Sequence, residues 1–124
     1  MLKGLYSHLA SADLQFSDRI YPFQAPQAPK LPIAVYNLMR SDRELKNDGP
    51  DRIVSSRVQI DVYAATDYEA LDVGKAVREL LHGYSGLWGD TRIQGIRAEG
   101  DQMFVESDPK QFRFSFDCLI WHVE

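Results

Sequence analysis

The fold is decided by two extended runs, Leu31-Pro-Ile-Ala-Val-Tyr-Asn-Leu-Met39 and Ile53-Val-Ser-Ser-Arg-Val-Gln-Ile-Asp-Val-Tyr-Ala64. The second run alternates between apolar side chains on one side (Val58, Ile60, Val62, Ala64) and polar ones on the other (Arg57, Gln59, Asp61). A period of two is typical of a strand with one buried face. Two such runs on either side of a polar segment predict an antiparallel hairpin.

The segment between the runs, residues 41–52, is strongly charged. It holds four acidic and three basic side chains and contains the turn signal Asn47-Asp-Gly-Pro50. Hairpin loops usually have about 2–5 residues, and structureless loops of ~12 or more are usually functional or disordered. Eight or nine strand residues span on the order of 28 Å, which is more than a domain of this size needs for its own core. We therefore interpret the hairpin as an arm that reaches a partner.

The charged residues of this arm are the first interface candidates: Arg40, Asp42, Arg43, Glu44, Lys46, Asp48, Asp51 and Arg52. Charges of both signs give a contact register and specificity more than affinity. The alternative is a solvated surface loop with no role.

Hydrophobic periodicity predicts two helices. The first spans residues 2–10, with Leu2, Leu5, Tyr6 and Leu9 recurring at helical spacing. The second begins at the capping box Thr66-Asp-Tyr-Glu69 and ends at Gly83, which can adopt the left-handed conformation. Its apolar stripe of Ala70, Val73, Gly74, Val77, Leu80 and Leu81 predicts packing on a sheet.

The remaining segments predict further extended structure. Residues 19–23 form a short strand, and the proline-containing residues 24–30 form a surface loop. Residues 91–99 form a strand with a bulge at Gly95, Gly100-Asp101 makes a tight turn, and residues 103–106 return. Asp108-Pro109 turns again, and the alternating residues 111–123 form a strand in the centre of the sheet.

Together these elements predict an α+β fold: a mostly antiparallel sheet with two helices packed on one face and a long protruding β-hairpin. A chain of 124 residues fits a single domain, residues 1–124.

Three large apolar side chains have two interpretations each. Leu119 and Trp121 interrupt the polar side of the last strand, so either the helices or another chain covers them. Trp88 packs in the core or contacts a second subunit, because tryptophan is enriched at interface hot spots.

Composition argues against several function classes. The net charge is −4 and no basic cluster occurs, which argues against sequence-specific nucleic-acid binding. The single cysteine, Cys118, reads as a buried apolar residue. The sequence has no paired metal-ligand motif, nucleophile turn or phosphate loop, so we predict no catalytic, metal or cofactor site. No signal peptide or membrane span is recognisable, and we expect folding in a cytoplasm.

A series of short segments, in order along the chain, carries a resemblance to a known family. They are Leu2-Lys-Gly-Leu-Tyr-Ser-His-Leu-Ala10, Arg19-Ile-Tyr-Pro22, Ala25-Pro-Gln-Ala-Pro-Lys-Leu-Pro-Ile-Ala-Val-Tyr36, Arg57-Val-Gln-Ile-Asp-Val-Tyr63, Tyr68-Glu-Ala70 with Ala76-Val-Arg78, and Phe112-Arg-Phe-Ser-Phe-Asp117. In this series the chain resembles the tail-completion, or tail-terminator, proteins of long-tailed bacteriophages and prophages.

The resemblance implies a non-enzymatic structural protein of the virion tail, assembled in the host cytoplasm. Such proteins form rings, commonly hexameric, on the end of the tail tube, stop its growth and support joining to the head. The implied partners are further copies of the chain, the tail tube protein and the head connector protein. It also implies that the polar loop at residues 41–52 faces the ring lumen or the adjoining ring.

Two other functions remain open at this stage. A small α+β enzyme or ligand-binding domain would need a polar pocket that gathers His82 or His122 with carboxylates. A host-side adaptor would grip one partner through the hairpin alone.

Overall fold

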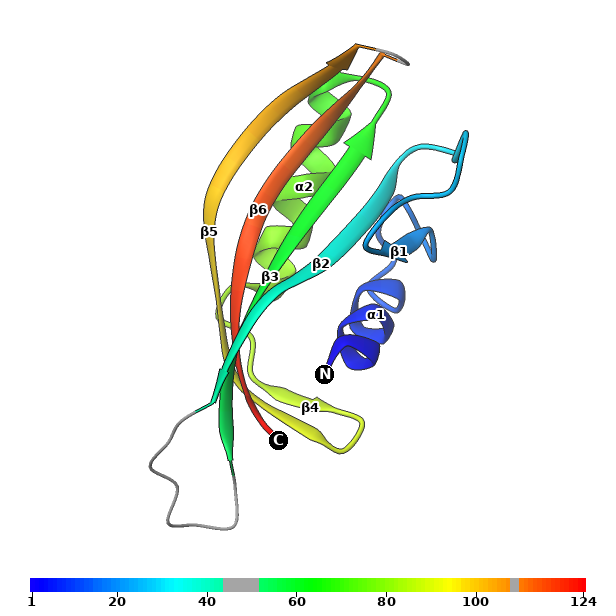
Figure 1. Cartoon of the computed structure of the whole chain (residues 1–124). Helices are drawn as coiled ribbons and strands as arrows, with labels where there is room; N and C mark the ends of the chain where they lie inside the picture. Colours follow the sequence, from blue (N-terminus) through cyan, green and yellow to red (C-terminus); the bar gives the residue numbers. More distant parts are fainter. Residues whose placement is uncertain (44–51, 108–109) are drawn as a thin grey trace.

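The computed structural model describes residues 1–43, 52–107 and 110–124 and shows a curled six-stranded sheet with two helices (Figure 1). The elements are α1 (Leu2–Ala10), β1 (Ile20–Pro22), β2 (Ile33–Arg43), β3 (Ile53–Ala64), α2 (Asp67–Leu81), β4 (Gly86–Trp88), β5 (Thr91–Ser107) and β6 (Lys110–Val123). The strand order is β1-β2-β3-β6-β5-β4. All neighbours pair antiparallel except β1 and β2, which are parallel. The α+β fold is thus confirmed.

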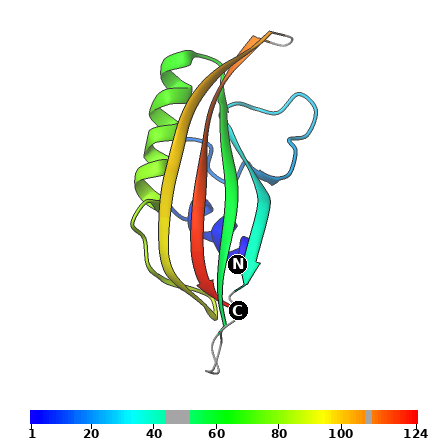
Figure 2. The same ribbon diagram turned by 60° about the vertical axis from the view of Figure 1, so that its left-hand side comes forward.

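Both helices cover the same face of the sheet (Figure 2). Leu5 and Leu9 of α1 and Val73 and Val77 of α2 are buried in one core with the inward side chains of the sheet. Gly74 lies on the ring of Phe114, so helix and strand approach closely there. Burial of each large apolar side chain stabilises the fold by about 1.5–3 kcal/mol, which makes this layer the main source of stability.

The predicted ends of α2 are confirmed. Thr66 precedes the helix, and its side-chain oxygen accepts a hydrogen bond of 3.2 Å from the backbone N–H of Glu69. Gly83 follows the helix with φ +82, a conformation that favours glycine.

Strand β6 lies between β3 and β5, which confirms its predicted central place. Phe114, Phe116, Cys118 and Ile120 are buried on the helix side. Arg113 and Asp117 alternate with them and lie on the opposite face, which we call the helix-free face.

The predicted tight turn at Gly100-Asp101 is wrong. Residues 91–107 form one strand, β5, and only a register shift between Glu99 and Gln102 marks the site. Gly100 has φ +76, so the left-handed residue makes a bulge while β5 continues along β6. The predicted bulge at Gly95 is confirmed by the shift between Ile93 and Gly95.

The hairpin of β2 and β3 exists, but its strands are longer than the sequence predicts. Ser41, Asp42 and Arg43 belong to β2 instead of to the loop. Strand β6 pairs with β3 as far as Ile53, opposite Val123, so the described part of the hairpin is backed by a third strand. Residues 44–51 and the predicted turn at Asp108-Pro109 lie outside the described residues.

Candidate interaction surface

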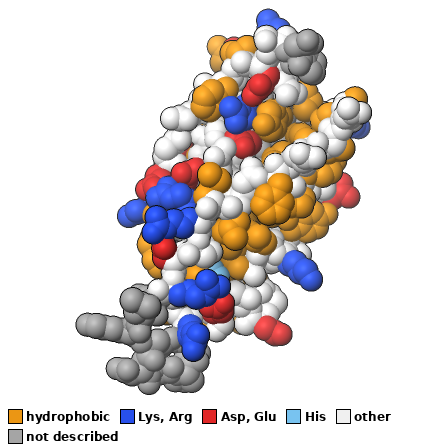
Figure 3. Space-filling view, in the orientation of Figure 1, with side chains coloured by type: hydrophobic (Ala, Val, Ile, Leu, Met, Phe, Trp, Pro, Cys, Tyr) orange, Lys and Arg blue, Asp and Glu red, His pale blue; other side chains and the backbone are white. Residues whose placement is uncertain are grey.

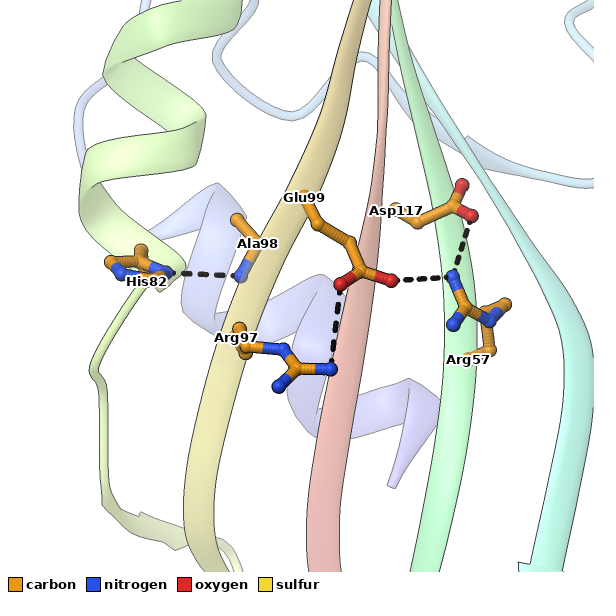
Figure 4. A network of polar contacts seen from close by, with 6 residues as sticks. All are labelled: Arg57, His82, Arg97, Ala98, Glu99 and Asp117. Carbon is orange, nitrogen blue, oxygen red and sulfur yellow. Dashed lines mark hydrogen bonds and ion pairs between the residues drawn. The ribbon is translucent and has the colours of Figure 1, made fainter.

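The helix-free face carries an ion-pair network that joins three strands. Nη1 of Arg57 on β3 lies 2.9 Å from Oε1 of Glu99 on β5 and 2.9 Å from Oδ2 of Asp117 on β6 (Figure 4). Nη2 of Arg97 lies 3.4 Å from Oε2 of Glu99. These groups are part-exposed, where an ion pair contributes about 0–1 kcal/mol. The network therefore fixes the positions of charges on the surface and adds little to the stability of the fold.

A second cluster surrounds Arg113 on the same face. Its Nη1 lies 3.7 Å from Oδ1 of the buried Asp61, and its Nε lies 3.3 Å from Oε1 of Glu106. The guanidinium carbon is 4.2 Å from the ring centroid of Phe104. In Figure 3 charged side chains of both signs gather on this face. The arrangement is balanced in sign, as suits a protein partner better than a polyanion.

Leu119 and Trp121 lie within this polar face. They pair with Arg57 and Ser55 of β3 and are partly buried. The guanidinium carbon of Arg97 is 5.8 Å from the ring centroid of Trp121. Both helices pack on the opposite face, so they do not cover Leu119 and Trp121. That another chain covers these two side chains stays a prediction.

The described end of the hairpin is tied to the C-terminal residue. Nε and Nη2 of Arg43 donate to the two carboxylate oxygens of Glu124 at 2.8 and 2.9 Å, and the N–H of Glu124 donates to the carbonyl of Arg52. The hydrogen bonds from Arg43 hold the pKa of Glu124 below its ordinary value. Nε of Arg40 lies 2.9 Å from Asp42. Of the predicted interface residues, Glu44, Lys46, Asp48 and Asp51 lie outside the described residues.

A buried hydrogen-bond chain crosses the sheet beside this hairpin end. The hydroxyls of Ser41 and Ser56 are 2.8 Å apart, and the Ser56 hydroxyl is 2.8 Å from Nε2 of His122. The chain joins β2, β3 and β6. Burial, followed by the charge of the N-terminal amino group, lowers the pKa of His122 below its ordinary 6.5.

Because the pKa of His122 is lowered in the folded chain, we expect the free energy of unfolding to decrease in mild acid. The pKa of His122, and that of His8 by burial, is lower in the folded chain than the ordinary 6.5. As the pH falls below 6.5 the unfolded chain takes up protons that the folded chain does not, so the free energy of unfolding decreases. Urea unfolding at pH 7.5 and 5.5 checks this, and both values lie above the range in which Glu124 titrates. His122→Gln should reduce the difference, whereas equal or greater stability at pH 5.5 would contradict it.

Trp88 is buried in the core, which was the first of its two interpretations. It is 6% exposed and packs so closely on α1 that a Cβ at Gly4 would lie 2.4 Å from the Trp88 Cβ. Its ring lies near those of His8 and Tyr84, beside an open groove of about 600 Å³. A role of Trp88 in subunit contact is untested, and little of the side chain is available for it.

His82 and His122 each make a hydrogen bond within the fold. Nδ1 of His82 accepts a hydrogen bond from the backbone N–H of Ala98, and His122 bonds to Ser56. The described residues contain no group of three or more His, Cys, Asp or Glu side chains arranged to hold a metal ion. Within the same residues no helix is long and apolar enough to cross a membrane.

Two features of the surface do not follow from the sequence pattern. The pattern places Arg57 and Asp117 on the polar sides of their strands, but their pairing with Glu99 depends on strand order. It does not indicate the exposure of Met103, Phe104 and Val105, which are expected in a returning strand of the sheet. Strand β4, which pairs with the first residues of β5, has too few residues to show a period.

Comparison with protein families decides the identity of this fold. The family model described as "Tail completion protein gp17" matches residues 3–123. The chain belongs to this family. It is therefore a structural protein of a bacteriophage-type tail.

A solved structure shares the fold of this tail completion protein. It is a chain from the "Virion of native gene transfer agent (GTA) particle", with a TM-score of 0.69 and 17% sequence identity. The match covers 97% of this chain and 92% of that one. No curated protein sequence matches the chain.

Proposed function

We propose that this tail completion protein closes the end of the tail tube as an oligomeric ring, ends tail elongation and supports head–tail joining, without enzymatic activity. The observation that carries the proposal is the family match over residues 3–123. The likeness to a chain from a virion particle supports assembly with other structural proteins. The proposed partners are further copies of the chain, in a six-fold ring, the tail tube protein and the head connector protein.

The surface chemistry supports a partner of this kind. A ring built from one chain needs a head-to-tail interface closed by rotation. The helix-free face offers fixed charges of both signs around Leu119 and Trp121, which suits a specific contact with another protein. The hairpin end at Arg40, Asp42, Arg43 and Arg52 is the proposed contact to an adjoining ring.

A deletion tests this function. Particles assembled without the chain should yield separate heads and tails, with tails of variable or excessive length in electron micrographs. Adding purified chain to such a lysate should restore joined particles. Joined tails of normal length in the absence of the chain would contradict the proposal.

Neither of the other functions gains support from the described residues. His82 and His122 each hold a structural hydrogen bond, and neither lines one of the described cavities. The surface network in Figure 4 is part-exposed, and through Asp117 it borders an open cavity of about 340 Å³ that contains no histidine.

A further inference from the structure

Two exposed apolar segments lie at opposite edges of the sheet. Phe23, directly after β1, is 63% exposed, and on β5 Met103, Phe104 and Val105 are 42%, 38% and 65% exposed. Neighbouring exposed apolar side chains mark interaction sites more often than single ones do.

The strand register places these segments at the same height in the sheet. The N–H of Phe23 donates to the carbonyl of Tyr36. From there the pairing runs Tyr36↔Ile60↔Phe116, and Ser115, adjacent to Phe116, pairs with Gln102. Three residues further along, the pairing runs Ile33↔Tyr63↔Arg113↔Phe104. By this register the segment after β1 and residues 102–105 of β5 are at a similar height, at opposite edges of one sheet, and residues 25–29 line an open cavity of about 390 Å³ together with Glu106.

The outer edge of β5 is open at this height. Strand β4 pairs only with residues 91–93, and the end of α2 reaches the β5 backbone through Gly83 and His82, at Ile96 and Ala98. In the described part of the chain no strand pairs with the outer side of residues 102–107. Protected edges carry charges or bulges along their length, yet residues 103–105 are three exposed apolar side chains in a row.

The segment that follows β1 is irregular and strained. Residues 25–30 make no backbone hydrogen bond to the described chain. Phe23 and Ala28 have φ of +69 and +49, which costs energy for residues other than glycine. Strain that persists at exposed residues is characteristic of functional segments. The segment ends at Lys30. On the β5 side, Asp101 and Glu106 pair with Arg78 and Arg113 of the same chain.

We propose that residues 23–30 of one copy pack on the outer edge of β5, residues 102–107, of the next copy. This inference rests on the proposed ring. Because the two segments differ and lie level on opposite edges, a rotation about an axis along the strands brings them together and repeats from copy to copy. Such a head-to-tail contact closes into a ring, whereas a two-fold contact would stop at a dimer.

Matched charge substitutions test the contact. Phe23→Asp and Val105→Asp each place a carboxylate in the apolar contact, while Leu87→Asp, at a 67% exposed site on β4, is the control. We expect the first two to reduce the occupancy of tail-tube ends about ten-fold or more and the control to bind like the wild type. Thermal unfolding, monitored by circular dichroism, establishes that all three variants fold. Normal binding by either contact variant, or an equal loss in the control, would overturn the inference.

Cross-linking tests the direction of the contact. With tubes present and a bis-maleimide reagent, the double variant Phe23→Cys, Val105→Cys should give a ladder of oligomers. Val105→Cys alone should stay monomeric, and dimers from it would show a two-fold contact and overturn the inference. The native Cys118 does not interfere because it is buried, and burial raises the pKa of its thiol to about 12.

The outcomes separate the two proposals. If the wild-type chain never binds tube ends, the proposed function fails and the inference fails with it. If the wild type binds and the Phe23 and Val105 variants bind equally well, the function stands and only this contact is wrong.

Discussion

Replacing Phe116 with alanine is expected to lower the free energy of unfolding by about 3–5 kcal/mol. The ring is fully buried in the centre of β6, in the layer between the sheet and the helices. Its removal leaves a cavity that neighbouring strands cannot close, because β6 is hydrogen-bonded on both sides. Since domains of this kind have a total stability of about 5–15 kcal/mol, the variant should be marginal.

Urea unfolding measures this effect directly. Leu87→Ala serves as the control, because its side chain is largely exposed, and its stability should change by less than about 0.5 kcal/mol. A loss below about 1 kcal/mol for Phe116→Ala would show that this layer is not the core of the fold.

Gly74→Ala is expected to destabilise the chain by about 1–3 kcal/mol, although alanine is the better helix former by about 1 kcal/mol. A Cβ at this position would lie 2.3 Å from Cδ1 and 2.8 Å from Cβ of Phe114. The second contact is close to the strand backbone, so a rotation of the ring alone does not relieve it. The helix must move away from the sheet.

A double-mutant cycle checks the cause of that loss. Phe114→Ala removes every side-chain atom beyond Cβ and leaves only the Cβ contact, so the double variant with Gly74→Ala should lose less stability than the two single variants together. Lys75→Ala, on the same helix but exposed, is the control and should be nearly neutral. Additive losses, or a gain of stability in Gly74→Ala, would contradict the close approach.

Local signals in the sequence predicted the helices and the central strand well. The ends of α2 depend on Thr66, Glu69 and Gly83, which act within one turn of the helix and need no knowledge of the rest of the fold. The alternation in β6 is also local, because a buried strand face leaves a period of two in its own residues.

Features that depend on strand order could not be predicted from the sequence. Gly100 followed by Asp101 is compatible with a turn and with a bulge, and the pairing of β5 with β6 decides between them. Likewise Arg57, Glu99 and Asp117 come from three strands, so their ion pairs follow from the register and not from spacing. The polarity of residues 41–43 predicts a loop, whereas pairing with residues 54–56 continues the strand.

The measurement that tests the central claim most directly is the position of this chain in an assembled particle. Electron cryo-microscopy of joined heads and tails, with averaging at the head-proximal end of the tube, would resolve it. The account predicts one closed ring of equivalent copies between tube and connector. Copies distributed along the tube, or a tube end that lacks the chain, would contradict it.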